Sequence, residues 1–135
     1  MVKACLNGRR SKAEHPAVPV TPAELAAEAP RAASLIHPAR GWPRVLVEIV
    51  RAAPDATADA DRILCQLDAS RVNAPRLLHG EGQTCWPLIR HAGRLALATR
   101  IGLEDTLTGP DGSPVSGNAE LIQLALAAWA AAAPR

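Results

Sequence analysis

The segment RIGLEDTL, residues 100–107, ends an apolar run with three charged side chains, Arg100, Glu104 and Asp105. Charged groups are rarely buried unless they are paired or take part in chemistry. A carboxylate can bind a metal ion or move a proton, and an arginine can stabilise a developing oxyanion. Two interpretations are therefore open: a strand end with solvated charges, or the polar end of an active site.

Similar side chains lie in or after each of the other strands that the sequence predicts. Because the carboxyl ends of parallel strands line the active sites of α/β folds, these residues are candidates for one cleft. Its imidazoles and carboxylates would give this cleft metal-binding and acid–base potential. The candidates are Asn7, Arg10, His37, Glu48, His79 and Glu81.

Alternating strand and helix patterns position these residues. Runs of β-branched and apolar residues predict strands, and an apolar stripe at helical spacing predicts helices. Thr21 and Glu24 form a capping box for the first helix, and Asn118 is expected to cap the last one. We expect strands over residues 2–8, 33–36, 44–50, 74–82 and 95–105, and helices over 21–29, 55–70, 84–93 and 118–133, with Gly93 just past the end of the third helix. Short connections between alternating elements require parallel strands, so the expected fold class is α/β.

The composition suits a single domain over residues 1–135, with a formal net charge of +2 and 48% hydrophobic residues. The basic residues are scattered, which argues against nucleic-acid binding, and no uninterrupted apolar stretch reaches the length of a membrane span. Because the three cysteines are odd in number and lack metal-type spacing, we expect buried thiols in a reducing cytoplasm.

Two segments carry a resemblance to a known family. The stretches ACLNG…PAVPVTPAELAAEA near the start and RIGLEDTL…SGNAELI near the end resemble the two ends of the β-keto acid cleavage enzymes, such as the 3-keto-5-aminohexanoate cleavage enzyme. The resemblance covers blocks of roughly residues 1–40 and 43–130. It implies a (β/α)8 barrel with one zinc ion, in which acetyl-CoA and a β-keto acid give acetoacetate and a new acyl-CoA.

The resemblance also implies roles for individual residues. Glu104 and His37 would ligate Zn²⁺, and Arg100 and Asp105 would form the catalytic pair that takes part in substrate deprotonation. Zinc would polarise the keto group as a Lewis acid. The expected substrate-binding residues are Asn7, Arg10, His79 and Glu81. In the aminohexanoate-cleaving members of the family, a glutamate at the position of Arg10 recognises the amino group of the substrate. Because Arg10 is positively charged, the resemblance implies a substrate with a second carboxylate or another polar acceptor instead.

Besides Arg10, the chain departs from the family at two further points. Leu35 stands where the first histidine of a His-x-His zinc pair is expected, which leaves His37 and Glu104 unless His79 or Glu81 substitutes. A complete barrel needs about 250 residues, so the 135 residues predict a barrel truncated to about five strands, with an internal deletion near residues 39–44.

Three functions remain open from the sequence. The chain is a zinc-dependent β-keto acid cleavage enzyme, a non-catalytic remnant that associates with itself or with a full-length paralogue, or an unrelated small α/β binding module, because a fold-level pattern alone does not fix function. A homo-oligomer is expected in the first two cases, because an open sheet leaves apolar edges to cover.

Overall fold

The computed structural model shows a mixed α/β chain. The residues that it describes are 2–5, 11–21, 23–24, 27–28, 31, 45–49, 55–71 and 74–134. Their elements, in chain order, are β1 (Val2–Cys5), β2 (Val45–Ile49), α2 (Ala56–Ala69), β3 (Arg76–Gly80), the 3-10 turn η1 (Gly82–Thr84), α3 (Cys85–Arg94), β4 (Thr99–Gly102) and α4 (Asn118–Ala132). The predicted strand over 33–36 and the predicted deletion near 39–44 lie outside the described residues.

The strands pair in parallel, as the alternating pattern predicted. β1 pairs with β4, and β2 pairs with β3. A parallel bridge between Leu77 and Ala98 joins β3 to β4, supported by a hydrogen bond from the Leu78 N–H to the Ala98 carbonyl. The resulting order is β2–β3–β4–β1, so the last strand lies beside the first.

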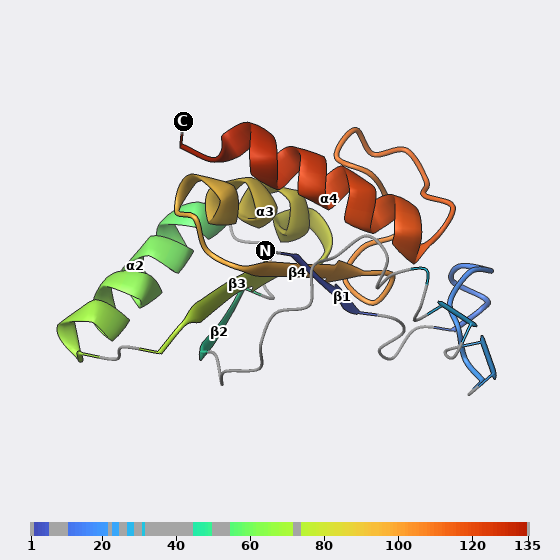
Figure 1. Cartoon of the computed structure of the whole chain (residues 1–135), viewed down its shortest axis with the longest axis horizontal. Coiled ribbons are helices and arrows are strands. Elements are labelled where there is room, and N and C mark those ends of the chain that lie inside the picture. The colour runs from blue at the N-terminus through green and yellow to red at the C-terminus, as the bar shows by residue number, and fades with distance from the viewer. Residues whose placement is uncertain are drawn as a thin grey trace.

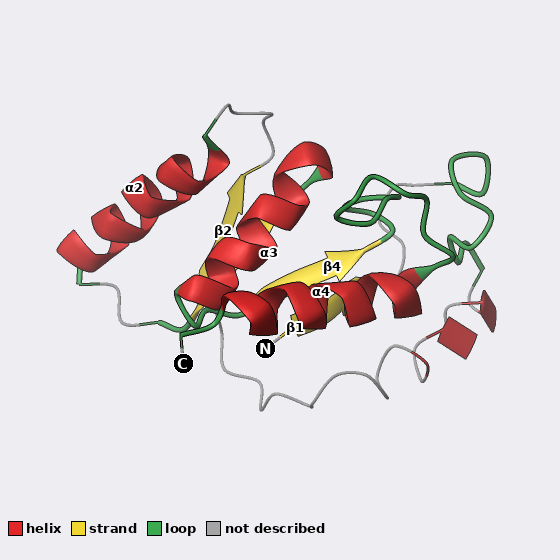
Figure 2. Cartoon of the chain, turned by 90° about the horizontal axis from the view of Figure 1, so that it is seen from above, coloured by secondary structure: helices red, strands yellow, loops and turns green. Residues whose placement is uncertain are grey.

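The helices α2, α3 and α4 all lie on one side of these strands (Figures 1 and 2). Alternate strand residues point toward them, because successive side chains of a strand face opposite sides. Val47, Ile49 and Leu78 pack against α2 and α3, whereas Ile101 packs with α3 and α4. The helix α3 therefore lies between two apolar clusters, and Trp129 of α4 contacts both of them.

The capping box predicted at the start of the chain is confirmed. The backbone N–H of Glu24 donates to Thr21 Oγ1 over 3.2 Å, and the N–H of Thr21 donates to Glu24 Oε2 over 2.9 Å. Lys12 approaches the same carboxylate at 2.6 Å. Together with the N–H groups of Val20 and Thr21, this contact lowers the pKa of Glu24 to about 2.

The end of α3 differs from the expectation that Gly93 follows the helix. Gly93 lies inside the last turn. There α4 passes so close that a Cβ would be 2.3 Å from the Trp129 carbonyl oxygen, so only glycine fits. The helix instead exits through Ala96, whose φ is +53°. The Leu97 N–H donates to the Ala92 carbonyl and the Ala96 N–H to the Gly93 carbonyl, as in a Schellman motif. Because Ala96 and Leu97 belong to this exit from α3, β4 begins only at Thr99 and is shorter than the strand predicted over 95–105.

The start of α4 is a second correction. Asn118 was expected to cap the helix, but Gly117 holds the N-cap position and Asn118 is the first helical residue. Its Oδ1 accepts a hydrogen bond of 2.9 Å from the backbone N–H of Leu103, and both residues are fully buried. The Asn118 side chain therefore links the start of α4 to the turn that follows β4. Local sequence patterns do not indicate this long-range hydrogen bond.

We expect Ala96→Gly to stabilise the chain by about 0.5–1 kcal/mol, because glycine adopts a left-handed conformation without the steric cost of a Cβ. Denaturant unfolding followed by circular dichroism measures this change. The matched control is Ala127→Gly, at an exposed position inside α4, which should destabilise by about 1 kcal/mol. Destabilisation by Ala96→Gly would contradict the left-handed exit of α3.

Asn118→Ala should destabilise by about 1–3 kcal/mol, because it leaves the buried N–H of Leu103 without its acceptor. The same unfolding measurement applies, with the exposed Gln123→Ala on α4 as a control expected to change stability by less than about 0.5 kcal/mol. Equal effects of the two variants would show that the side-chain bond to Leu103 contributes nothing.

Candidate functional site

Three polar side chains lie in one row across the strands. Glu48 of β2 and His79 of β3 are register partners. The Leu77–Ala98 bridge places His79 level with Arg100 of β4, two residues further along each strand. Because their neighbours Val47, Leu78 and Ile101 face the helices, these three side chains belong to the opposite face of the strands.

His79 lies at the centre of the row. The residue is 1% exposed, and its Nε2 lies 3.3 Å from Glu48 Oε1 and 3.2 Å from Asp105 Oδ1. Two carboxylates thus approach one ring nitrogen. An imidazole between carboxylates can hold a proton and pass it to a neighbouring group, which is the basic requirement of acid–base catalysis.

Three carboxylates surround the guanidinium of Arg100. Its Nη2 lies 3.2 Å from Glu104 Oε1, 3.5 Å from Asp105 Oδ1 and 3.7 Å from Glu48 Oε1. Asp105 is fully buried, whereas the Arg100 side chain is 26% exposed. The interpretation of RIGLEDTL as a solvated strand end is therefore wrong for Asp105, because this carboxylate is enclosed beside two basic groups.

Loop contacts hold the ends of the strands together. The Gly82 N–H, after β3, donates to the Asp105 carbonyl over 2.7 Å. Thr84 Oγ1 lies 2.9 Å from both the Ile49 carbonyl at the end of β2 and the Glu81 carbonyl after β3. Sequence reasoning missed this role of Thr84, because its contact with Ile49 joins residues 35 positions apart and depends on strand pairing. The only sequence signal was its place at the start of a helix.

Gly80 permits the close approach of these segments. A Cβ at Gly80 would lie 2.6 Å from Thr84 Oγ1, 2.6 Å from Leu88 Cδ1 and 2.9 Å from the Thr84 carbonyl oxygen. Any larger residue would displace Thr84, and with it the link between the ends of β2 and β3. The glycine therefore serves the geometry of the site next to His79.

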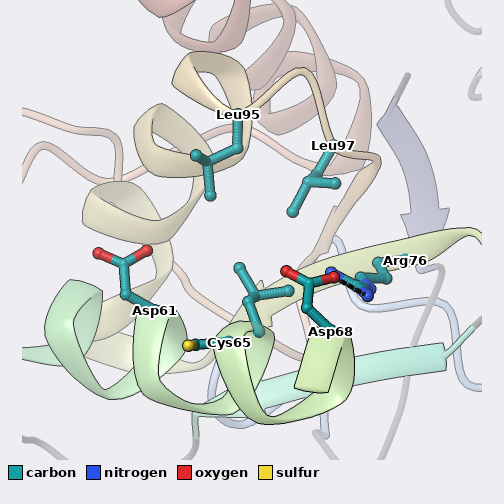
Figure 3. Close-up of a pocket in the computed structure, with 7 residues that line it drawn as sticks. Asp61, Cys65, Asp68, Arg76, Leu95 and Leu97 are labelled. Carbon is teal, nitrogen blue, oxygen red and sulfur yellow. Dashed lines mark hydrogen bonds and ion pairs between the residues drawn. The ribbon is translucent and has the colours of Figure 1, made fainter. Parts of the chain in front are cut away.

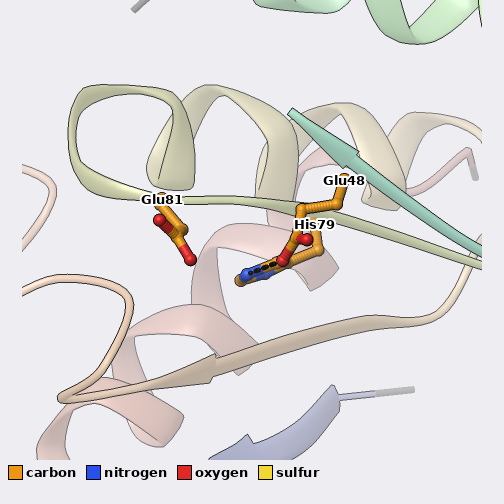
Figure 4. Close-up of side chains that lie close together, drawn as sticks. All are labelled: Glu48, His79 and Glu81. Atoms are coloured by element: carbon orange, nitrogen blue, oxygen red, sulfur yellow. Dashed lines mark ion pairs between the residues drawn. The ribbon is translucent and has the colours of Figure 1, made fainter. Parts of the chain in front are cut away.

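Residues suited to a divalent cation occur in the same region (Figure 4). Glu48, His79 and Glu81 each offer a ligand atom, and these atoms all lie within 4.8 Å of one another. One imidazole nitrogen with two carboxylates matches the chemistry of zinc ligands. Of the ligands expected from the resemblance, Glu104 pairs with Arg100 and His37 lies outside the described residues; their assignment to zinc stays a prediction.

The structure brings together most of the predicted site residues that it describes. Arg100, Glu104, Asp105 and His79 share one network of ion pairs, and Glu81 joins it through the possible cation site. Glu48, noted in the sequence without an assigned role, contributes to both groupings. The predicted residues Asn7, Arg10 and His37, and the replacement residue Leu35, lie outside the described part of the chain.

The expectation of buried thiols holds for Cys85 but is wrong for Cys65. Cys65 is exposed on α2 because the buried residues of that helix, Ala60 and Leu64, turn it outward. Cys85, at the start of α3, is buried; this burial and, secondarily, the charge of Asp105 raise the pKa of its thiol to about 12. Cys85 is therefore a packing residue rather than a nucleophile.

A separate groove of about 360 Å³ lies between α2 and the turn that leads from α3 to β4 (Figure 3). Its lining includes Leu64, Leu95 and Leu97 together with Asp61 and Asp68. These two carboxylates already have partners within the chain. Asp68 pairs with Arg76 at 2.5 Å, which lowers the pKa of Asp68, and Asp61 pairs with His91 at 2.6 Å. The groove contains none of the predicted site residues.

No known family model matches this chain, and no curated protein resembles it significantly. The resemblance to the β-keto acid cleavage enzymes therefore stays a prediction from the sequence. Among the helices in the described ranges, none combines the length and hydropathy that a membrane crossing requires.

A thiol-labelling experiment checks the burial of Cys85. With Cys5 replaced by serine, the native chain should react with one equivalent of an aromatic disulfide reagent at pH 8, at Cys65. A second equivalent should react only after unfolding, because the pKa of the Cys85 thiol is about 12 in the folded state. Rapid reaction of two thiols in the native state would contradict the buried position.

Proposed function

We propose that this chain is an enzyme of β-keto acid cleavage, built on part of a (β/α)8 barrel. In the overall reaction, the bond between the keto carbon and the CH2COO⁻ unit of the β-keto acid breaks. That unit joins the acetyl group of acetyl-CoA to give acetoacetate, and the remaining acyl group leaves as its CoA thioester. The observation that carries the proposal is the convergence of Arg100, Asp105 and His79 on one face of a parallel strand row.

The order of the strands supports the barrel part of the proposal. In a closed barrel of parallel strands, the last strand pairs with the first, and β4 pairs with β1 here. A barrel also has its helices outside, and its active site lies at the carboxyl ends of the strands, where inward-facing side chains contribute to it. The helices here cover one face of the strands, and Glu48, His79 and Arg100 belong to the other face.

Arg100 is the residue that would bind the negative charge of the reacting unit. Its guanidinium is held by three carboxylates but remains partly exposed, so it can meet an incoming carboxylate or enolate oxygen. Glu104 is its nearest partner among these carboxylates and would act as a positioning residue for the guanidinium. The proposed site thus stabilises charge that develops when the carbon–carbon bond breaks.

Asp105 would take up the proton that leaves the substrate. Its Oδ1 lies 3.5 Å from Arg100 Nη2 and 3.2 Å from His79 Nε2, so the proton would be held next to the guanidinium that binds the enolate, by a carboxylate that the imidazole positions. Enclosure of the Asp105 side chain excludes water from that proton. When bound, zinc would supply Lewis-acid polarisation of the keto oxygen.

A non-catalytic remnant is the second candidate function. The specific observation that favours it is the strand face opposite the helices, where Leu46 of β2 is 45% exposed. An apolar residue on an open strand face favours association with a second chain. In this case the chain would form stable oligomers and make no acyl-CoA.

The test of the proposed function is an assay of the purified chain with acetyl-CoA and a panel of β-keto acids, with acetoacetate as the measured product. Arg100→Lys should lower kcat/KM by about 100-fold or more, because lysine keeps the charge but loses the planar fork. Arg62→Lys, at an exposed arginine of α2, is the matched control and should leave kcat/KM unchanged. A folded wild-type chain that gives no acetoacetate with any substrate would refute the proposal and leave the remnant.

A further inference from the structure

We infer that a divalent transition-metal ion of the zinc type binds between Glu48, His79 and Glu81, rather than at Glu104. This inference deepens the proposed function, since it concerns the metal that the cleavage reaction would use. It rests on the described side chains alone, and direct metal binding tests it without any measurement of turnover.

The spacing of the three side chains suits one ion. Ligands at about 2.1 Å from a tetrahedral zinc ion lie about 3.4 Å from each other. The His79 Nε2 and Glu48 Oε1 atoms are 3.3 Å apart, and the ligand atoms of all three residues lie within 4.8 Å of one another. Glu48 and Glu81 are exposed at this point, so small side-chain rotations can complete the closure.

The buried imidazole of His79 is a second observation, independent of the spacing, that points to a bound ligand. Although two carboxylate oxygens lie near its Nε2, neither ring nitrogen of His79 makes a hydrogen bond within the described residues. A buried polar group without a hydrogen bond is costly. A single proton on Nε2 cannot form equally good hydrogen bonds to Glu48 and to Asp105. A cation beside the ring would instead bind the nitrogen and offset the negative charge of the carboxylates.

The donor set defines the class of metal. Imidazole nitrogen with carboxylate oxygen suits zinc and its first-row neighbours, whereas magnesium and calcium prefer oxygen ligands alone. Three protein ligands leave a fourth position open, as in catalytic zinc sites. The open position would be on the same strand face as Arg100, the residue proposed to bind the reacting carboxylate.

Glu104 has a different partner in this geometry. Its carboxylate lies 3.2 Å from Arg100 Nη2, which makes it the nearest of the three carboxylates around that guanidinium. Binding a metal at Glu104 would draw this carboxylate away from Arg100. The position of Leu35, where a zinc-binding histidine is expected from the resemblance, is consistent with a metal held by other residues.

Zinc titration of the full chain by isothermal calorimetry, after removal of metal with a chelator, tests the inference. The wild type should bind about one Zn²⁺ per chain, and Mg²⁺ should not compete. Glu48→Gln, Glu81→Gln and His79→Asn should each weaken zinc binding by about 100-fold or more, because each removes one of three ligands. Asp59→Asn, which removes an exposed carboxylate from α2, should change the affinity by less than about 3-fold.

Glu104→Gln separates this site from the one that the resemblance implies. Its zinc affinity should stay within about 3-fold of the wild type, since it removes a nearby charge but no ligand. Circular dichroism checks that each variant is folded; the exposed positions Glu48 and Glu81 carry the test if His79→Asn does not fold. The inference is overturned if the folded wild type binds no zinc. It is equally overturned if Glu104→Gln abolishes binding while Glu48→Gln and Glu81→Gln retain it.

The two proposals fail in different ways. Zinc bound at Glu48, His79 and Glu81 without acetoacetate formation would refute the cleavage function and leave the metal site standing. Acetoacetate formation with zinc that depends on Glu104 alone would refute the metal site and leave the cleavage function standing.

Discussion

The parallel register between β2 and β3 is the constraint on which the site depends. It sets Glu48 beside His79, and the single bridge from β3 to β4 sets His79 level with Arg100. Because side chains alternate along a strand, a slip of one residue in either pairing would turn a site residue toward the helices. The apolar residues between them, Val47, Leu78 and Ile101, hold the register because they must face the core.

The close packing of α3 is what makes that register possible. Its residues Ile89 and Leu88 belong to two different apolar clusters, one shared with α4 and one shared with α2. Gly93 lets α4 contact the backbone of α3. Gly80, at the end of β3, lets Thr84 in the turn before α3 approach the strand. The helices α2, α3 and α4 lie on one side of the strands (Figure 2). The polar side chains of Glu48, His79 and Arg100 therefore remain together on the other face.

Electrostatic pairing then shapes what the site can do. Carboxylates gather around one guanidinium and one imidazole, so the region is rich in groups that bind cations and move protons. The two groups of side chains suit different ligands. Arg100 is suited to an anionic substrate, whereas Glu48, His79 and Glu81 are suited to a metal ion. The proposed cleavage of β-keto acids uses both kinds of group on one face.

Much of the local structure was determined by the sequence itself. The alternation of elements, the helix α2 and the box of Thr21 and Glu24 follow from short-range patterns, because caps and amphipathic stripes are made by neighbours in the chain. The sequence also identified Arg100, Asp105 and His79 as candidates, since charged residues at strand ends are uncommon without a role.

Only the tertiary structure decided how these residues combine. Strand pairing made Glu48 a partner of His79, and packing turned Asn118 from an expected cap into the acceptor for Leu103. The burial of Cys85 and the exposure of Cys65 were also set by packing, although both lie in helices that the sequence predicted. Such contacts join residues 15 or more positions apart, and no local propensity encodes them.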